Sequence, residues 1–300
     1  MEREEHKVLL RRGTFFAIVV VTAALIASGC DPKPSADEKS RAGRERSKQE
    51  EITGKNGSSM VLIPAGEFSM GSPDEEGYND ERPLHKVYLD AYYMDKYEVN
   101  NDQYARFLNT YGKDTDDNGN KMIYENSWGV QKKGKTWQAA AGHEKNPVVY
   151  VTWYGANQYA KHYGKRLPTE AEWEKACRAG ATTKYYFDNN EADLPTYAWY
   201  RKNSGNTTHP VGLKRPNGWG IYDILGNVHE WCADWRDPTY YKSSPRKNPQ
   251  GPPKGTFRVT RGGSWNYFAF GCRCAVRNWS NPNCSYYSVG FRCAANVTGR

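Results

Sequence analysis

Apolar and polar residues alternate along the chain from Met60 onward, which is the period expected of half-buried strands. The stretch MVLIPAGEFSMGS shows this alternation on both sides of a Pro-Ala-Gly turn, and HKVYLDAYYMDKYEV repeats it. Alternation over short runs is the usual signature of a strand. The pattern therefore predicts strands at the start of the folded part of the chain.

A helical period replaces the alternation at three places. NNDQYARFLN starts at Asn100 with Gln103 three residues later, which is the arrangement of a capping box. TWYGANQYAKHYG places its apolar residues on one stripe. Further on, Thr169 and Glu172 repeat the capping box, and Gly180 ends the run. We expect one helix at each of these places.

Residues 262–293, GGSWNYFAFGCRCAVRNWSNPNCSYYSVGFRC, follow neither period. Between the ends GGSW and GFR, this segment mixes Tyr, Phe, Trp, Cys, Ser and Asn in no regular order. It is a catalytic loop, a binding surface or merely a loop, and periodicity alone does not decide among these interpretations.

The composition adds a globular core and many turns. The 300 residues are 38% hydrophobic and 14% aromatic, with 10 Trp and 22 Tyr, so aromatic rings supply much of the core. The 28 Gly and 16 Pro favour a loop-rich fold. The net charge of +8 suits an anionic partner, but the Lys and Arg residues are spread along the chain and no nucleic-acid-binding motif collects them. We therefore expect no nucleic acid among the partners.

Residues 1–29 resemble a bacterial lipoprotein signal peptide. HKVLLRRG is basic, TFFAIVVVTAALIA is apolar, and SGC brings small residues up to Cys30. The resemblance implies cleavage before Cys30 and lipidation of that residue, with an uncleaved or ordinary secretory signal as the alternative. Residues 30–56, poor in large apolar side chains, predict a disordered tether, followed by one domain at 57–300. We expect an exported protein, anchored by its lipid to a membrane of the bacterial cell envelope.

Several further blocks of the sequence resemble one known family. They are MVLIPAGEFSMGS, EVNNDQYARFLN, VTWYGANQYAKHYGKRLPTEAEWEKACRAG, NGWGIYDILGNVHEW, RGGSW and GFR. In this order, across about residues 60–295, they resemble the formylglycine-generating enzyme family, also called sulfatase-modifying factors. The resemblance implies an α+β fold of the C-type lectin type, loop-rich with little regular secondary structure, which agrees with the Gly and Pro content.

Active members of that family oxidise a cysteine of sulfatases to formylglycine, using copper held between two thiolates. The resemblance implies a C-x-x-x-x-C pair whose first cysteine lies three residues after the Ser of GGS. Here that Ser is Ser264, the first position is Tyr267, and only the second, Cys272, is a thiol. The remaining pair, Cys272 and Cys274, has C-x-C spacing. We therefore expect no copper and no catalytic residues, and keep an oxidase that uses Cys272 and Ser264 as the alternative.

The C-terminal segment is also similar to the variable proteins of diversity-generating retroelements, which share this fold and end in a GGSW…R.A.RN…NP…GFR frame. In those proteins, mutation of adenines converts Asn codons into codons for Tyr, Phe, Ser, Cys or Gly, among others. The resemblance implies a variable ligand-binding region at about 262–293. The candidate ligand-binding residues are Trp265, Tyr267, Phe268, Phe270, Cys272, Cys274, Trp279, Ser280, Asn283, Tyr286 and Tyr287.

The residue types of this segment favour a binding surface on physical grounds as well. Tyr and Trp offer large rigid contact areas, and Ser, Asn and Gly add adaptable hydrogen bonds. The alternative is that several of the rings belong to the core, as aromatic residues usually do. We expect non-covalent binding of an unknown protein or surface ligand. A structural envelope protein with neither ligand nor activity is a further alternative.

The block YDILGNVHEW predicts a structural calcium site. The family resemblance implies that its ligands are Asp223, the carbonyls of Gly226 and Val228, and Glu230, all of them the oxygen ligands that Ca²⁺ prefers. A purely structural turn with a hydrogen-bonded Glu is the alternative.

A second, weaker calcium motif lies in DTDDNGNKMIYE. Asp114, Asp116, Asn118 and Glu125 occupy ligand positions of an EF-hand loop. Because the residues that follow do not look helical, a polar hairpin turn is the alternative.

The family resemblance also pairs the cysteine of KACRAG with that of GFRC. We therefore expect a disulfide between Cys177 and Cys293, which an oxidising compartment permits. Cys232 is expected to be a small buried residue.

Overall fold

The computed structural model describes residues 50–297, which belong to one folded unit of the chain. The predicted signal peptide, Cys30 and most of the predicted tether lie outside these residues. The end of the tether is folded, however, because β1 (Glu51–Thr53) pairs with β2 (Ser59–Ile63), ahead of the boundary predicted at residue 57. All side chains of β1 are exposed. Backbone pairing with β2 and an ion pair between Glu51 and Lys96 hold this strand, so its composition gave no sign of it. No helix within residues 50–297 has the length and apolar character needed to cross a membrane.

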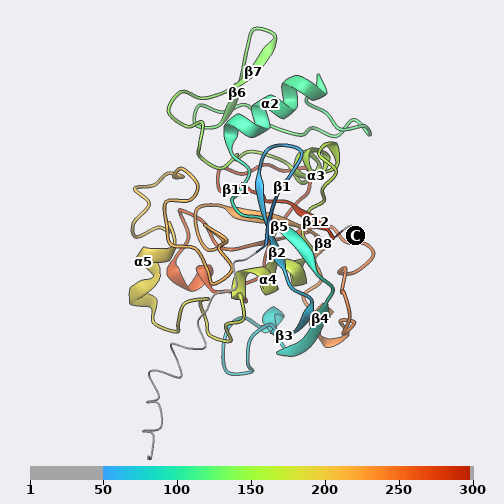
Figure 1. The fold of residues 1–300 in the computed structure, drawn as a ribbon, viewed down its shortest axis with the longest axis vertical. Helices are drawn as coiled ribbons and strands as arrows, with labels where there is room; N and C mark the ends of the chain where they lie inside the picture. The colour runs from blue at the N-terminus through green and yellow to red at the C-terminus, as the bar shows by residue number, and fades with distance from the viewer. Residues whose placement is uncertain (1–49, 298–300) are drawn as a thin grey trace, which may run out of the picture. The chain divides into compact units, whose positions relative to one another are not determined.

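A four-stranded sheet in the order β1-β2-β5-β12 joins the two ends of the described chain (Figure 1). β5 (Tyr92–Asp95) pairs antiparallel with β2 on one side and with β12 (Ala294–Asn296) on the other. β3 (Gly66–Met70) and β4 (His85–Leu89) form a separate antiparallel pair. The strands predicted from alternation are therefore confirmed.

A second four-stranded sheet, in the order β10-β9-β8-β11, holds the C-terminal segment. β8 (His229–Trp235) and β9 (Arg258–Arg261) are antiparallel. The C-terminal segment adds β10 (Asn278–Ser280) on the side of β9 and β11 (Val289–Gly290), parallel to β8. The chain between these strands is thus tied to a sheet at both ends.

The three predicted helices are confirmed as α2 (Asn101–Tyr111), α3 (Trp153–His162) and α4 (Glu170–Arg178). The side chain of Asn100 accepts a hydrogen bond from the backbone N–H of Gln103 and completes the predicted capping box, and α4 begins with the same arrangement. Capping satisfies backbone donors that a helix start would otherwise leave without partners.

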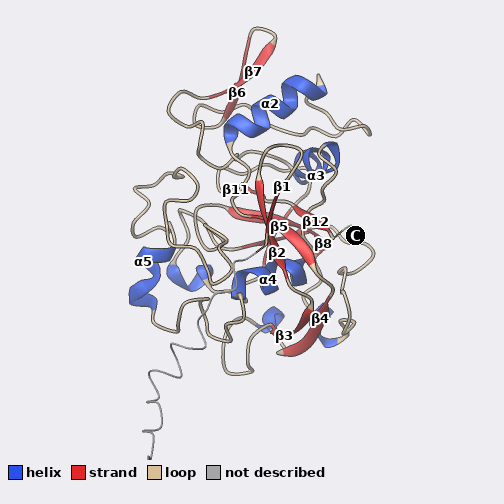
Figure 2. Ribbon diagram, viewed as in Figure 1, coloured by secondary structure: helices blue, strands red, loops and turns tan. Residues whose placement is uncertain are grey.

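The rest of the described chain is largely loop (Figure 2). α5 (Leu194–Tyr197) is a single turn, and the hairpin of β6 (Val130–Lys133) and β7 (Thr136–Ala139) lies beside α2 (Figure 1). The expected α+β, loop-rich fold is therefore confirmed.

Helix α4 lies in the main hydrophobic core and is buried along its whole length. Trp173 and Cys177 supply its apolar contacts, while Glu170 and Glu174, one turn apart, bring two carboxylates into the interior. Buried carboxylates require charged or hydrogen-bonding partners. Arg277 of the C-terminal segment pairs with Glu170, and Arg261, directly before this segment, pairs with Glu174.

Candidate ligand-binding face

Six aromatic side chains of the C-terminal segment are open to solvent. Phe268 has 66% of its surface exposed, and the others have between 39% and 46%. These six residues, named the aromatic face below, are Tyr267, Phe268, Phe270, Trp279, Tyr286 and Tyr287. Asn283 is also exposed and Ser280 is half-buried. A gathering of exposed rings in one segment is a feature of interaction sites on proteins.

The remaining predicted contact residues are buried. Cys272 and Cys274 have no exposed surface, and both belong to the main core. The prediction that they contact a ligand is therefore wrong, because residues 271–277 form a wholly buried stretch between the exposed Phe270 and the exposed Trp279. Trp265 is also buried, but one side of its ring borders a surface hollow.

Two buried arginines anchor the middle of the segment. Arg273 binds Glu81, a residue of the short loop helix Asn79–Glu81, through two hydrogen bonds of 2.8 and 2.9 Å. Arg277 binds Glu170 of α4 in the same two-pronged way, at 2.7 and 2.8 Å. Burial alone raises the pKa of Glu81 and of Glu170, yet the facing guanidinium groups lower both values, so the pairs are ionised.

Two further arginines fix the ends of the segment. Arg261, at the end of β9, pairs with Glu174 of α4 at 2.5 Å and donates to the backbone carbonyls of residues 274–276. Arg292 pairs with Glu230 of β8 at 2.7 Å. Because these guanidinium groups reach carboxylates on other elements, the backbone of the segment is held independently of its exposed side chains.

Backbone contacts from neighbouring loops complete this support. The N–H of Arg201 donates to the carbonyl of Tyr267, and the N–H of Tyr150 donates to the carbonyl of Tyr286. The ring of Tyr267 stands edge-on against His229, 4.7 Å away. Burial lowers the pKa of His229 to about 4, so this support is uncharged at neutral pH.

One hollow of about 510 Å³ lies at the Trp279 end of the aromatic face. The guanidinium of Arg236 stacks on the Trp279 ring at 3.7 Å and pairs with Asp80 at 2.7 Å. Tyr78, which also lines this hollow, packs edge-on against Phe270 at 5.2 Å. This site, called the Trp279 hollow below, combines aromatic walls with charged groups, as binding sites commonly do.

A second hollow, of about 420 Å³, lies at the Trp265 end. Trp128, Tyr150, Trp265 and Tyr287 form its aromatic walls. The guanidinium of Arg201, at its edge, lies 4.7 Å from the centre of the Phe268 ring. This site is called the Trp265 hollow below. Because Asn266 lines it and Tyr267 lines the Trp279 hollow, the two hollows flank one stretch of chain.

Sequence reasoning did not find the residues that other loops contribute to this surface. Tyr78, Trp128, Arg201 and Arg236 lie far from the C-terminal segment in the sequence and sit in no periodic pattern. Their only signal is residue type, since arginine and aromatic residues in loops are common at binding sites.

Comparison with known proteins places the fold in a family. Residues 45–297 match the family described as "Sulfatase-modifying factor enzyme 1-like domain". The chain belongs to this family. It is 33% identical to the formylglycine-generating enzyme of Streptomyces coelicolor, with 92% of this chain and 96% of that protein covered. The predicted family and fold are therefore confirmed.

The chain is also similar to a second relative and to a solved structure. The chain is 41% identical to "Serine/threonine-protein kinase pkn1" of Chlamydia pneumoniae over 79% of its own length, but it spans only 38% of that relative. It also resembles the solved structure of Treponema denticola variable protein 1, with a TM-score of 0.65, 28% identity, and 83% of this chain and 99% of that chain covered.

The positions of the cysteines differ from the expectation. The Sγ atom of Cys177 lies 3.5 Å from that of Cys274, whereas Cys293 lies in another core cluster and its backbone N–H donates to Asp95. The predicted Cys177–Cys293 disulfide is therefore wrong, because α4 faces the middle of the C-terminal segment and not its end. Cys232 is buried, as expected.

The thiols do not form the copper site of active family members. Cys274 lies against Cys177, and within residues 50–297 no sulfur–sulfur contact joins Cys272 to either of them. Burial raises the pKa of Cys272 to about 12, which keeps its thiol protonated at neutral pH. The hydroxyl of Ser264 donates to the side chain of Asn266. These residues do not fit a copper ion held between two thiolates.

In the predicted calcium site, the Glu230 carboxylate is engaged by other side chains. Both carboxylate oxygens of Glu230 accept hydrogen bonds from Arg292, and one also accepts from the indole of Trp173. Asp223 keeps one oxygen without a partner among the described residues, and burial raises its pKa to about 6. Since Glu230 has no oxygen to spare, the ligand set does not fit Ca²⁺, and the geometry favours the structural-turn interpretation.

The weaker calcium motif is a hairpin turn. Asp116 accepts hydrogen bonds from the backbone N–H groups of Asn118 and Asn120, and Glu125 accepts one from the backbone of Lys132. Asp114 pairs with the Lys121 side chain. Within residues 50–297, no three His, Cys, Asp or Glu side chains gather in a way that could hold a metal ion.

Proposed function

We propose that this sulfatase-modifying factor family member is a lipid-anchored protein of the bacterial cell envelope that binds a ligand non-covalently through the aromatic face. The observation that carries the proposal is the combination of six exposed rings with a backbone fixed by buried arginine–carboxylate pairs. A rigid backbone reduces the entropy lost when a partner orders these side chains.

The chemistry of the face supports this proposal. Tyr, Trp and Arg are the residues that dominate the binding energy of protein interfaces. The two hollows give a partner concave places into which its own side chains can insert. The likeness to a solved structure named a variable protein adds support for a binding role on this scaffold.

The variable-region hypothesis can be tested by sequencing codons 260–295 in many copies of the locus. We expect substitutions at codons of the aromatic face, and none at Arg273, Arg277 or Cys274, whose side chains are buried. A nearby reverse-transcriptase gene and a template copy with adenines at the changed positions are expected as well. If the codons are invariant across the population and no template copy exists, the variable-region hypothesis is contradicted.

The anchor can be tested separately from binding. Metabolic labelling with a radioactive fatty acid is expected to mark the wild-type protein and to leave it in the membrane fraction. Cys30→Ala is expected to remove the label, while Cys284→Ala, which changes another cysteine outside the core, should retain it. Equal labelling of both variants would show that Cys30 is not the lipidated residue.

A formylglycine-generating oxidase is the second candidate, favoured by the identity to an enzyme of that name over nearly its full length. The test is copper-dependent conversion of a sulfatase-derived cysteine peptide to an aldehyde. We expect no conversion, because Tyr267 replaces the first thiol and the Cys272 thiol is buried. Aldehyde formation that disappears in Cys272→Ser would establish the oxidase instead.

A further inference from the structure

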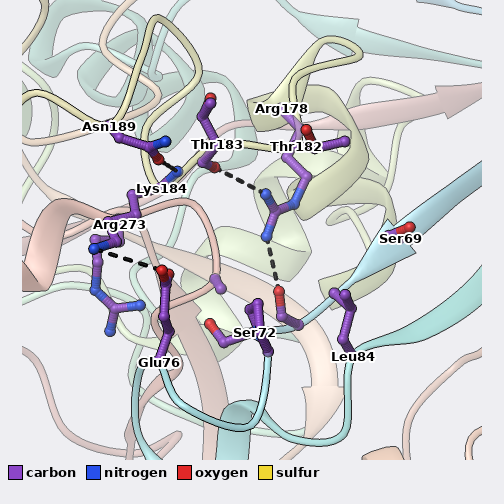
Figure 3. Close-up of a pocket in the computed structure, with 13 residues that line it drawn as sticks. Ser69, Ser72, Glu76, Leu84, Arg178, Thr182, Thr183, Lys184, Asn189 and Arg273 are labelled. Carbon is purple, nitrogen blue, oxygen red and sulfur yellow. Dashed lines mark hydrogen bonds and ion pairs between the residues drawn. The ribbon is translucent and has the colours of Figure 1, made fainter.

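In a polar hollow of about 270 Å³ beside the C-terminal segment, the positive charges of the lining side chains are balanced by carboxylates. Figure 3 shows Arg178 reaching toward the backbone near Ser72 and Thr183, and Lys184 reaching toward Glu76. Each cation of this hollow has a carboxylate partner. The pairs are Arg178–Glu174, Lys184–Glu76 and Arg273–Glu81. An incoming anion meets no uncompensated positive charge here.

The Trp279 hollow is different. Its carboxylate, Asp80, is paired with Arg236, and Arg277 is paired with Glu170 in the interior. Lys242 also lines the hollow, at the end of the short helix Tyr240–Lys242, and is exposed. Within residues 50–297 no carboxylate forms an ion pair with Lys242, so this hollow carries one positive charge that is available to a ligand.

The Trp265 hollow carries another such charge. No acidic side chain lines it, and Arg201 at its edge is exposed. In the described part of the chain, the guanidinium of Arg201 contacts the Phe268 ring and pairs with no carboxylate. Stacking on a ring leaves the donor groups at the guanidinium edge free to bind an anion. Each end of the aromatic face therefore presents one uncompensated cation.

We propose that the partner is a protein that presents an acidic segment, with carboxylates that bind Arg201 and Lys242 and apolar side chains that contact the rings between them. This inference rests on the proposed binding function and adds the chemistry of the ligand. An arginine binds a carboxylate through two parallel hydrogen bonds, which fixes the orientation of the partner as well as its charge. A charged rim of this kind guides association and excludes partners of the same charge.

A protein fits this surface better than other anionic polymers do. Nucleic-acid sites neutralise many phosphates along a continuous row of cations, whereas these hollows offer two uncompensated ones. The predominance of Tyr, Trp and Phe between the two cations matches the composition of protein interfaces. An acidic polysaccharide is the competing source of carboxylates, and the experiment below separates it from a protein.

The test is selection of random dodecapeptides displayed on phage against the purified full chain. We expect the enriched peptides to carry net negative charge and to contain aromatic or apolar residues. For a synthetic enriched peptide, Arg201→Glu and Lys242→Glu are each expected to raise Kd about fivefold to tenfold, and added salt should also raise it. Arg201→Gln, which removes the charge without reversing it, should have a smaller effect.

Matched controls change the same charge elsewhere. Lys161→Glu on α3 and Lys135→Glu in the turn between β6 and β7 alter exposed lysines that line neither hollow. We expect these variants to bind the peptide with Kd values within about twofold of the wild type, because neither side chain lines a hollow that the peptide would occupy.

The outcomes separate failure of this inference from failure of the proposed function. Enriched peptides that require Trp279 and Phe268 but are neutral or basic would overturn the acidic partner and leave the binding function intact. Binding of polyglucuronate without any peptide enrichment would overturn the protein partner in favour of a polysaccharide. If the same peptides are enriched by a Phe268→Ala, Trp279→Ala double variant, the proposal that the aromatic face binds the ligand is contradicted.

Discussion

Within the C-terminal segment, two neighbouring sets of residues have opposite surroundings. Residues 271–277 are buried without exception, and two of their side chains, Arg273 and Arg277, form ion pairs with other parts of the fold. The aromatic face, one of whose members, Phe270, lies directly before this stretch, contacts solvent. The backbone position and the surface chemistry of this segment are therefore determined by separate residues.

This separation explains how a domain can keep its fold while its surface changes. Buried ion pairs are strongly destabilising when one partner is removed, because the other charge stays behind without compensation. Exposed rings carry no such penalty, since truncation leaves neither a cavity nor an unpaired charge. Mutation should therefore be tolerated at the face and not beneath it.

The largest expected effect follows from removing one member of a buried pair. Glu81→Ala leaves the Arg273 guanidinium buried without a carboxylate, and we expect a loss of about 3–5 kcal/mol in the free energy of unfolding. Urea denaturation of purified variants measures this loss. Glu67→Ala, which removes a carboxylate from the exposed Arg246 pair, is the matched control and should barely move the urea midpoint. Similar midpoints for both variants would show that the buried pair does not anchor the segment.

The next effect concerns the thiols that meet beneath the face. We expect Cys177 and Cys274 to form a disulfide after export, because their sulfur atoms already lie in contact. A nonreducing peptide map should join the peptides that contain these two residues and leave Cys293 free. Cys274→Ser is expected to lower stability by about 2–4 kcal/mol under oxidising conditions and by much less under reducing ones. A Cys177–Cys293 peptide in the map would restore the pairing expected from sequence.

Local sequence signals predicted the helices and strands well, because those signals act over a few residues. The Asn100–Gln103 and Thr169–Glu172 capping boxes marked helix starts that the structure contains. Pairings between distant residues carry no such signal. Glu81 meets Arg273 across almost two hundred residues of chain, and neither residue shows its partner in its own neighbourhood.

The candidate site could be predicted only in part for the same reason. The residue types of the C-terminal segment indicated a surface, but composition does not distinguish the inward Cys274 from the outward Phe270. In an extended or irregular stretch, that distinction depends on the partners that α4 supplies. The contributions of Arg201 and Trp128 depend on how separate loops pack, which no local pattern reports.

A smaller and pH-dependent effect is expected from Asp234, a buried residue of β8. Burial, together with the nearby Glu170 and Glu172 and against the opposing effect of Arg277, raises the pKa of Asp234 to about 8. The folded protein therefore binds a proton that the unfolded chain has lost above about pH 4, so this group makes stability fall as pH rises toward 8. We expect a lower melting temperature at pH 8 than at pH 6.5.

Asp234→Asn tests the origin of this trend. The amide keeps an oxygen for the hydrogen bond from the backbone N–H of Glu170 but has no proton to lose. We expect the decrease in melting temperature between pH 6.5 and 8 to shrink in this variant. His229 does not interfere, because its low pKa of about 4 costs stability only below about pH 6.5. An unchanged slope in the variant would assign the trend to another group.

The smallest effect on stability is expected at the aromatic face. Phe268→Ala removes the most exposed ring together with its contact to the Arg201 guanidinium, and we expect a loss below about 1 kcal/mol. The same urea experiment measures this loss beside that of Glu81→Ala. A loss as large as that of the buried pair would mean that the rings support the fold, and the structural envelope protein would then become the better interpretation. A small loss combined with failure to retain selected peptides would place the role of Phe268 in binding, because stability and affinity would then respond to different residues of one segment.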